Sequence, residues 1–228
     1  MEKEPEKPGL RVVGILGGVG SGKSTAARLL ARRLPGAVLD ADAEVARLLG
    51  DPGVQARIEA ALGGGLRSPE GPLDRRRLGA RVFSDPDARR RLEEILHPEV
   101  RKAHFAALEH LEASEKAVWA LLDVPLLLEK GLHRLCDFLV FVAAPEGVRA
   151  ARACARHGWS RQEWASREGE QKNLTQKRAL ADVILENGDD PRRLEVQVDA
   201  LIPRLKALPP RPLADRWPSW DQEPQPGT

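Results

Sequence analysis

Short apolar runs alternate with amphipathic helical stretches along this chain. Five such runs lie at 11–16, 37–39, 117–122, 137–142 and 182–185. They lack strict polar–apolar alternation, which is typical of strands covered on both faces of a sheet. Strands separated by helical patterns favour a parallel sheet flanked by helices. The pattern therefore predicts an α/β fold.

The interval between the second and third of these strands is too long for a single crossover helix. It is typical of several helices, one beginning near Asp74 and one at Pro86. Pro98 is expected to open a longer helix that runs to Glu112, since proline favours the first turn of a helix. We therefore expect an inserted helical subdomain over 51–115.

A second helical stretch runs from Pro145 to Leu180, and Gly158 interrupts it. A helical pair beside a sheet predicts a mobile lid, here 149–180. The core is expected to comprise 10–50, 116–148 and 181–207, with a last helix over 191–205. Residues 208–228 are rich in proline and polar residues and are predicted to be a disordered tail. Trp217 and Trp220 leave docking onto the body as the alternative.

Composition narrows the class of protein. The 228 residues are 42% hydrophobic and 31% charged, which is ordinary for a soluble globular chain. No apolar run approaches the ~18 residues that a membrane span needs. The polar start is unlike a signal or transit peptide, and the two cysteines, Cys136 and Cys154, lack metal-ligand spacing. We expect a cytoplasmic protein that does not bind membranes.

One motif carries strong chemical information. The segment from Gly17 to Ser24 matches G-x-x-x-x-G-K-[ST] between a predicted strand and a predicted helix. Glycines let backbone N–H groups turn inward around phosphate oxygens, and the helix N-terminus adds its positive dipole end. Lys23 is expected to contact the β- and γ-phosphates, and the Ser24 hydroxyl is expected to hold Mg²⁺. The predicted nucleotide site comprises Gly18, Val19, Gly20, Ser21, Gly22, Lys23, Ser24 and Thr25.

Two carboxylates follow the second predicted strand, at Asp40 and Asp42. Ligands of open α/β sheets bind at the carboxyl ends of the strands, so either carboxylate could accept a proton from an attacking hydroxyl. Asp42 is also a good helix N-cap. Asp123 ends the third predicted strand, where it could assist Mg²⁺ through water, cap a turn or orient a substrate.

Three arginines, Arg149, Arg152 and Arg156, share one face of the predicted lid helix. Guanidinium groups suit phosphate oxygens and can stabilise the charge on a phosphoryl group in transfer. A solvated basic face is the alternative. Because the helix follows a nucleotide loop, we expect at least one of these arginines to act on phosphate.

Further motifs follow the loop in order: Leu39-Asp40-Ala41-Asp42, Leu73-Asp74-Arg75-Arg76-Arg77-Leu78, Leu96-His97-Pro98, Val124-Pro125-Leu126-Leu127-Leu128-Glu129, and Ala181-Asp182-Val183-Ile184 with Asn187-Gly188. With them, the chain resembles the dephospho-CoA kinases, the last enzymes of coenzyme A synthesis, from about Val12 to Leu205. The phosphate loop is shared with many NTPases, so the later motifs carry the specificity.

The resemblance implies a P-loop NTPase-type core, a helical CoA-binding insertion and a helical lid. It implies transfer of the γ-phosphoryl group of ATP to the ribose 3′-hydroxyl of dephospho-CoA with Mg²⁺. Asp42 would be the base with Asp40 in support, and Lys23, Arg152 and Arg156 would act on phosphate. Gln171 and Lys177 match lid positions. Substrate-binding positions are Asp40, Asp42, Asp74, Arg75, Arg76, His97 and Glu129.

Simpler interpretations accompany several of these residues. Asp74 is a good N-cap, Arg75 and Arg76 could face water, and His97 with Pro98 is typical of a helix entry. Glu129 could bind substrate or lock a turn. Trp159 and Trp164 flank the lid turn and are expected to pack between lid helices rather than stack on a base.

Two rival functions stay open at this point. One is a kinase for another small metabolite or nucleoside. The other is an ATP-gated nucleic-acid-binding module, since most of the 36 basic residues are arginines. The formal net charge of only +2 and the lack of a recognised nucleic-acid motif disfavour the second.

Overall fold

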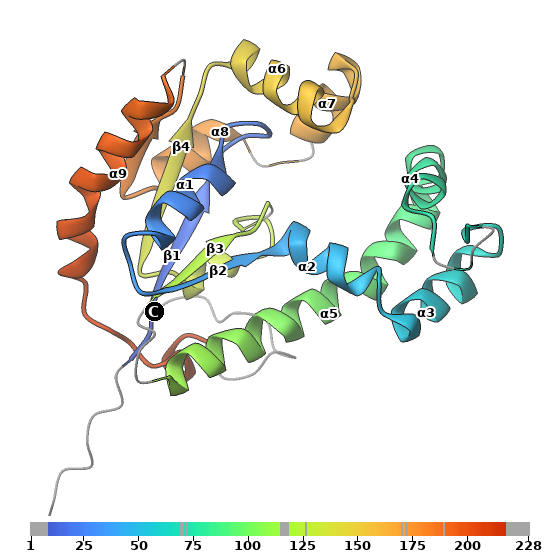
Figure 1. Cartoon of the computed structure of the whole chain (residues 1–228), viewed down its shortest axis with the longest axis horizontal. Helices are drawn as coiled ribbons and strands as arrows, with labels where there is room; N and C mark the ends of the chain where they lie inside the picture. Colours follow the sequence, from blue (N-terminus) through green and yellow to red (C-terminus); the bar gives the residue numbers. More distant parts are fainter. Residues whose placement is uncertain are drawn as a thin grey trace, which may run out of the picture. The chain divides into compact units, whose positions relative to one another are not determined.

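The computed structural model describes residues 9–68, 71, 73–114, 119–125, 127–169, 171, 173–188 and 190–217. They form two compact units, one of residues 1–40 and 107–228 and one of residues 41–106. Figure 1 shows the elements of both, coloured along the sequence. Each unit is described by itself below.

The first unit contains a five-stranded parallel sheet in the order β2-β3-β1-β4-β5. Its strands match the predicted runs to within about two residues at each end, and 117–118 lie outside the described part of the chain. The α/β prediction is thus confirmed. The strands are β1 (Arg11–Leu16), β2 (Gly36–Asp40), β3 (Trp119–Asp123), β4 (Phe138–Ala143) and β5 (Val183–Glu186).

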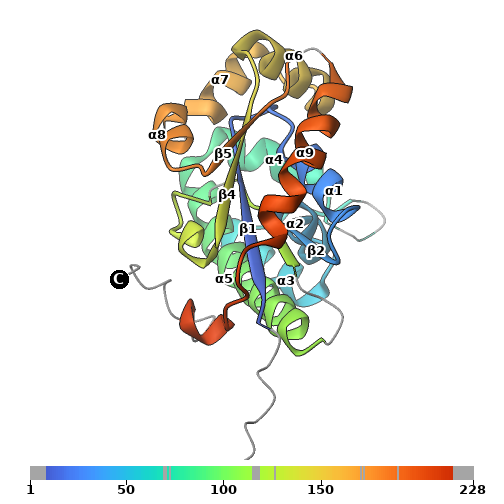
Figure 2. The same ribbon diagram turned by 90° about the vertical axis from the view of Figure 1, so that its left-hand side faces the viewer.

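One face of the sheet is covered by α1 (Lys23–Ala31) and α9 (Pro191–Lys206), which lie side by side in Figures 1 and 2. Asp190 caps α9 by accepting a hydrogen bond from the Arg192 amide at 2.9 Å. Alternate residues of the strands face these helices, as the period of a strand requires. The buried cluster includes Val13, Ile15, Ala27, Leu30, Leu121, Val140, Val142, Val198 and Leu201.

The connections after β3 and β4 complete this unit. A turn and a short 3₁₀ helix, η1 (Leu132–Leu135), lead from β3 to β4. After β4 come α6 (Glu146–His157), α7 (Arg161–Gly169) and α8 (Leu174–Ala179), which span the residues expected to act as a lid. Gly158 ends α6 in the left-handed conformation, with φ of 70°, and its amide donates to the Cys154 carbonyl at 2.9 Å. The predicted interruption at Gly158 is confirmed.

The prediction that the chain is disordered after residue 207 is wrong for 208–217. Leu10 and Arg211 form an antiparallel bridge beside the start of β1, and a 3₁₀ helix, η2 (Leu213–Asp215), follows. Trp217 is 1% exposed. Burial of an indole outweighs the polar composition that suggested disorder. Residues 218–228, with Trp220, lie outside the described residues.

A buried ion pair fixes this C-terminal segment. Arg216 donates to Asp137 at 2.6 Å and to the carbonyls of Leu10 and Leu135 at 2.6 and 2.7 Å. The same Asp137 carboxylate accepts the Val12 amide of β1 at 2.8 Å. The Arg216 side chain is fully buried, so its charge is compensated by this carboxylate and these carbonyls rather than by water.

The second unit is helical. It contains α2 (Ala41–Leu48), α3 (Pro52–Leu62), α4 (Arg75–Ser84) and the beginning of α5 (Pro86–Ala113). Asp51 caps α3 through the Val54 amide at 2.9 Å. A compact core holds these helices together, with Leu48, Val54, Ile58, Leu62, Leu66, Leu73, Leu78, Ala88 and Leu96. The helical insertion begins at residue 41 and ends at 106, against the predicted 51–115.

The expectation that Pro98 opens a helix is wrong, because α5 continues through it from Pro86 to Ala113. Proline removes one hydrogen bond from a helix interior and disfavours that position. Leu96 is nevertheless buried in the core of the second unit, and Phe105 and Leu108 are buried further along α5. Burial along both parts outweighs the local cost of Pro98. None of the helices among the described residues is long and apolar enough to cross a membrane.

Replacement of Arg216 by methionine should lower the free energy of unfolding by about 3 kcal/mol, because it leaves the Asp137 carboxylate buried without its closest cation. Chemical denaturation followed by circular dichroism measures this change. Arg211→Met is the matched control, since Arg211 is 48% exposed and lies 3.6 Å from the same carboxylate. It should cost less than about 1 kcal/mol. Equal losses for the two variants would contradict the assignment.

Candidate active site

The loop from Gly17 to Gly22 joins β1 to α1 at the carboxyl edge of the sheet. Since β1 lies between β3 and β4, the loop lies where the strand order reverses, the usual ligand position in open α/β sheets. Gly20 and Gly22 have φ of +84° and +97°, which L side chains rarely adopt. A Cβ at Gly20 would collide with the Arg149 carbonyl, and one at Gly22 with the Asn187 amide.

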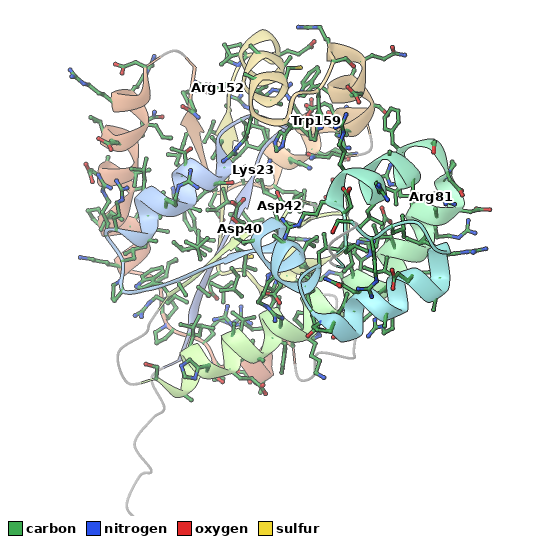
Figure 3. The ribbon with its side chains drawn as sticks, turned by 45° about the vertical axis from the view of Figure 1, so that its right-hand side comes forward. Lys23, Asp40, Asp42, Arg81, Arg152 and Trp159 are labelled. Carbon is green, nitrogen blue, oxygen red and sulfur yellow. The ribbon has the colours of Figure 1, made fainter. Side chains whose placement is uncertain are left out.

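Lys23, the first residue of α1, points back along the loop (Figure 3). Its ammonium donates to the carbonyls of Gly17 and Gly18 at 3.0 and 2.9 Å. The cation is thereby held against the loop, as a phosphate-binding lysine requires. Ser24, in the same first turn, is half-buried.

The far side of the loop is held by the segment after β5. The Asn187 side-chain amide donates to the Ser21 carbonyl at 2.7 Å, and both residues are buried. Arg152 of α6 donates to the carbonyls of Asn187 and Gly188 at 2.8 and 2.5 Å. Arg152, expected to act on phosphate, therefore contacts backbone next to the loop.

The three lid arginines have different environments despite their common helix face. Arg149 is buried and forms an ion pair with Glu168 of α7. Arg152 is half-buried, and Arg156 is exposed in the last turn of α6. The solvated-face interpretation is wrong for Arg149 and Arg152, because both guanidinium groups are engaged by protein oxygens.

The carboxylates are distributed between the two units. Asp40 ends β2 and is the register partner of Asp123, which ends β3 and is 4% exposed. These neighbouring strand ends lie at the carboxyl edge of the sheet, the edge that also carries the phosphate loop. Asp42 follows by two residues in the first turn of α2 and is exposed. Because α2 begins at Ala41, Asp42 lies within the helix and is not its N-cap.

Glu129, in the turn after β3, is held by a buried lysine. Its carboxylate lies 3.0 Å from the ammonium of Lys177 in α8, which is 1% exposed. The same ammonium donates to the Gln171 side chain at 2.9 Å. Of the two interpretations of Glu129, this contact favours a residue that fixes the turn.

The remaining predicted substrate residues lie in the second unit. Asp74 caps α4 by accepting the amides of Arg76 and Arg77 at 2.9 and 3.2 Å, so its capping interpretation is confirmed. Arg75 donates to the Ala46 carbonyl at 2.7 Å, and Arg76 is exposed. His97 lies half-buried inside α5, so the helix-entry interpretation is wrong.

Comparison with known proteins decides between the kinase families. The model of the dephospho-CoA kinase family matches residues 11–191. A dephospho-CoA kinase of Anaeromyxobacter dehalogenans is 44% identical over 200 residues, 86% of this chain and 93% of that protein. One of Deinococcus radiodurans is 41% identical over 196 residues, again 86% and 93%. The chain belongs to the dephospho-CoA kinase family.

Solved structures share the fold of this chain. The crystal structure of TT1252 from Thermus thermophilus is 38% identical with a TM-score of 0.67, covering 86% of this chain and 98% of that chain. The dephospho-CoA kinase of Campylobacter jejuni, 21% identical with a TM-score of 0.59, covers 86% and 97% and shares the fold. The resemblance inferred from the sequence motifs is confirmed, and the chain is a kinase of this family.

Neither cysteine is part of the nucleotide loop. Burial raises the pKa of the Cys136 thiol, which keeps it protonated and unreactive. Within the described ranges, His, Cys, Asp and Glu form no group of three or more that could hold a metal ion. At a phosphate loop, Mg²⁺ is typically bound by a hydroxyl of the loop together with oxygens of the nucleotide phosphates, so a cluster of carboxylates is not required.

Two residues that contact the loop backbone are not predicted as site residues from the sequence. Asn187 belongs to a family motif without an assigned role, and Glu168 belongs to none of the motifs. Their partners Ser21 and Val19 lie 166 and 149 residues away in the chain. Because the partners are so far apart in the sequence, no local sequence pattern predicts these contacts, and they are found only in the folded structure.

The glycines of the loop allow a matched test. Gly20→Ala should weaken ATP binding by about tenfold or more, because a side chain at φ +84° meets the Arg149 carbonyl and forces the loop to move. Gly147→Ala on α6, where a Cβ meets nothing within 4 Å, should leave ATP affinity unchanged. Equilibrium titration with ATP gives both values. Wild-type affinity in Gly20→Ala would contradict this account of the loop.

Proposed function

We propose that this protein transfers the γ-phosphoryl group of ATP to the 3′-hydroxyl of dephospho-CoA, giving coenzyme A and ADP. The observation that carries the proposal is a complete phosphate loop in a member of the dephospho-CoA kinase family, with Asp40 at the end of β2 on the same edge of the sheet. The cytoplasm is the proposed location.

The nucleotide-binding role falls to Gly18–Thr25. Amides of this glycine-rich loop and the N-terminus of α1 would surround the ATP phosphates, with Lys23 on the β- and γ-phosphates. The Ser24 hydroxyl would hold Mg²⁺, which supplies charge neutralisation on the phosphates. Positioning and electrostatics are the main contributions of the protein, since phosphoryl transfer needs little covalent help.

Asp42 is the proposed base. The 3′-hydroxyl oxygen attacks the γ-phosphorus as the bond to ADP breaks, and the hydroxyl proton passes to the Asp42 carboxylate. An exposed carboxylate in the first turn of α2 is accessible to such a substrate. Asp40, which ends the preceding strand, would support the orientation of the hydroxyl.

The lid arginines have separate proposed tasks. Arg156 is exposed, so its guanidinium can approach the phosphates as an arginine finger would. Arg152 would act on the transferring phosphoryl group only after releasing the carbonyls of Asn187 and Gly188. Substrate binding is assigned to the second unit. There Asp74 caps α4, which begins with Arg75 and Arg76, and His97 lies in α5.

A coupled assay of ADP formation tests the proposal. Dephospho-CoA should support turnover with ATP and Mg²⁺, whereas adenosine, pantothenate, shikimate and buffer alone should not. Faster turnover with another acceptor would assign the protein to a different metabolite. Equal ADP release with every acceptor and with buffer would make it a hydrolase and overturn the proposal.

Asp42→Asn should lower kcat by about 100-fold or more while leaving ATP affinity unchanged, because the amide cannot accept the proton. Lys23→Ala should lose both turnover and most ATP affinity. Glu44→Gln is the matched control, since it removes one charge from the same turn of α2, where Glu44 pairs with Arg47. Loss of ATP binding in Asp42→Asn by equilibrium titration would count against its assignment as the base.

A further inference from the structure

Both backbone polar groups of Val19 are bonded by side chains of one helix. The Val19 amide donates to the Glu168 carboxylate at 2.8 Å, and the Val19 carbonyl accepts from the Trp164 indole at 3.2 Å. Trp164 and Glu168 are one helical turn apart on α7, so they face the same way. Helix α7 thus binds the middle of the phosphate loop through two hydrogen bonds.

The charge of Glu168 is balanced beside the loop. Arg149 donates to the other Glu168 oxygen and, through Nε, to the Ala144 carbonyl at 3.1 Å. Its guanidinium also lies 5.5 Å from the centre of the Trp164 ring. The carboxylate therefore belongs to a neutral, largely buried group, with side chains 7% and 18% exposed for Arg149 and Glu168. A lone carboxylate at this position would repel the phosphates of ATP.

The contact between the phosphate loop and the side chains of α6 and α7 is close as well as polar. A Cβ at Gly18 would lie 2.8 Å from a Glu168 oxygen and would overlap the Arg149 guanidinium. Val19 also packs against the small buried cluster of Ala150, Ala153 and Trp164 between α6 and α7. Apolar packing and two hydrogen bonds therefore hold the same residue.

We propose that Trp164 and Glu168 are positioning residues for the ATP site, which they serve by fixing Val19. A loop rich in glycine has little conformational preference of its own, so its N–H groups converge on phosphate only if other parts of the protein hold the backbone. In this arrangement the Val19 amide donates to Glu168, and the loop keeps its shape through that bond. Arg149 supports the carboxylate and is a positioning residue too.

This inference rests on the proposed nucleotide site and deepens it, so its test measures ATP binding in the absence of dephospho-CoA. Glu168→Ala should raise the Kd for ATP by about tenfold or more, because it removes a charge-assisted hydrogen bond and leaves Arg149 without its partner. Glu168→Gln retains an oxygen for the Val19 amide and should recover most of the affinity. Trp164→Phe, which keeps an aromatic side chain but loses the indole N–H donor, should raise the Kd by about threefold.

Glu146→Gln is the matched control. It breaks the exposed Glu146–Arg161 ion pair, which also joins α6 to α7 but does not contact the loop. It should leave the Kd for ATP unchanged. Thermal unfolding of each variant identifies losses of fold, and Trp164→Phe carries the test if Glu168→Ala does not fold.

Steady-state kinetics distinguish a positioning role from a merely structural one, because a general structural defect would not affect the KM for ATP alone. Glu168→Ala should raise the KM for ATP while leaving the KM for dephospho-CoA near the wild-type value. Wild-type or tighter ATP binding in a folded Glu168→Ala would overturn the proposal, as would equal weakening of both substrates. If the wild-type protein itself does not bind ATP, the proposed nucleotide site fails first, which is a distinguishable result.

Discussion

The phosphate loop depends on backbone hydrogen bonds that come from outside it. Its glycines permit the left-handed turns that a phosphate cradle needs, but the same freedom makes the shape costly to maintain. Asn187 holds the Ser21 carbonyl on one side, while Trp164 and Glu168 hold Val19 on the other. The segment after β5, which includes Asn187, and α7 therefore both contribute to the proposed nucleotide site, although neither belongs to the motif.

The two compact units divide the proposed chemistry. The sheet-containing unit carries the phosphate loop and Asp40, and the helical unit begins at Ala41 and carries Asp42 in its first turn. The base proposed for the acceptor hydroxyl thus follows the last residue of β2 by two residues. Arg75, Arg76 and His97 belong to the same helical unit as Asp42.

Local sequence patterns were sufficient for much of this architecture. The five strands and the phosphate loop each have a short-range signal, namely an apolar run or a glycine pattern, and each was predicted close to its observed position. Asp74 likewise carries its capping signal in the neighbouring residues. The family assignment followed from motifs that could be seen without a structure.

Features that depend on distant contacts were not predictable in this way. Pro98 is predicted to start a helix because a proline inside a helix removes a backbone hydrogen bond, which the sequence alone shows. The burial along α5 that outweighs this cost depends on distant residues, which the sequence pattern does not show. The segment around Trp217 looked disordered because Asp137, which anchors it through Arg216, is 79 residues away. The arginines of α6 share a helix face, yet their separate partners, Glu168 and the carbonyls of Asn187 and Gly188, come from different elements.

The most direct measurement is the position of the transferred phosphate. Incubation of the full chain with γ-labelled ATP, Mg²⁺ and dephospho-CoA, followed by NMR of the purified product, identifies the oxygen that was phosphorylated. The account predicts label on the ribose 3′-oxygen and on no other hydroxyl. Label released as inorganic phosphate, or attached at a different hydroxyl, would contradict it.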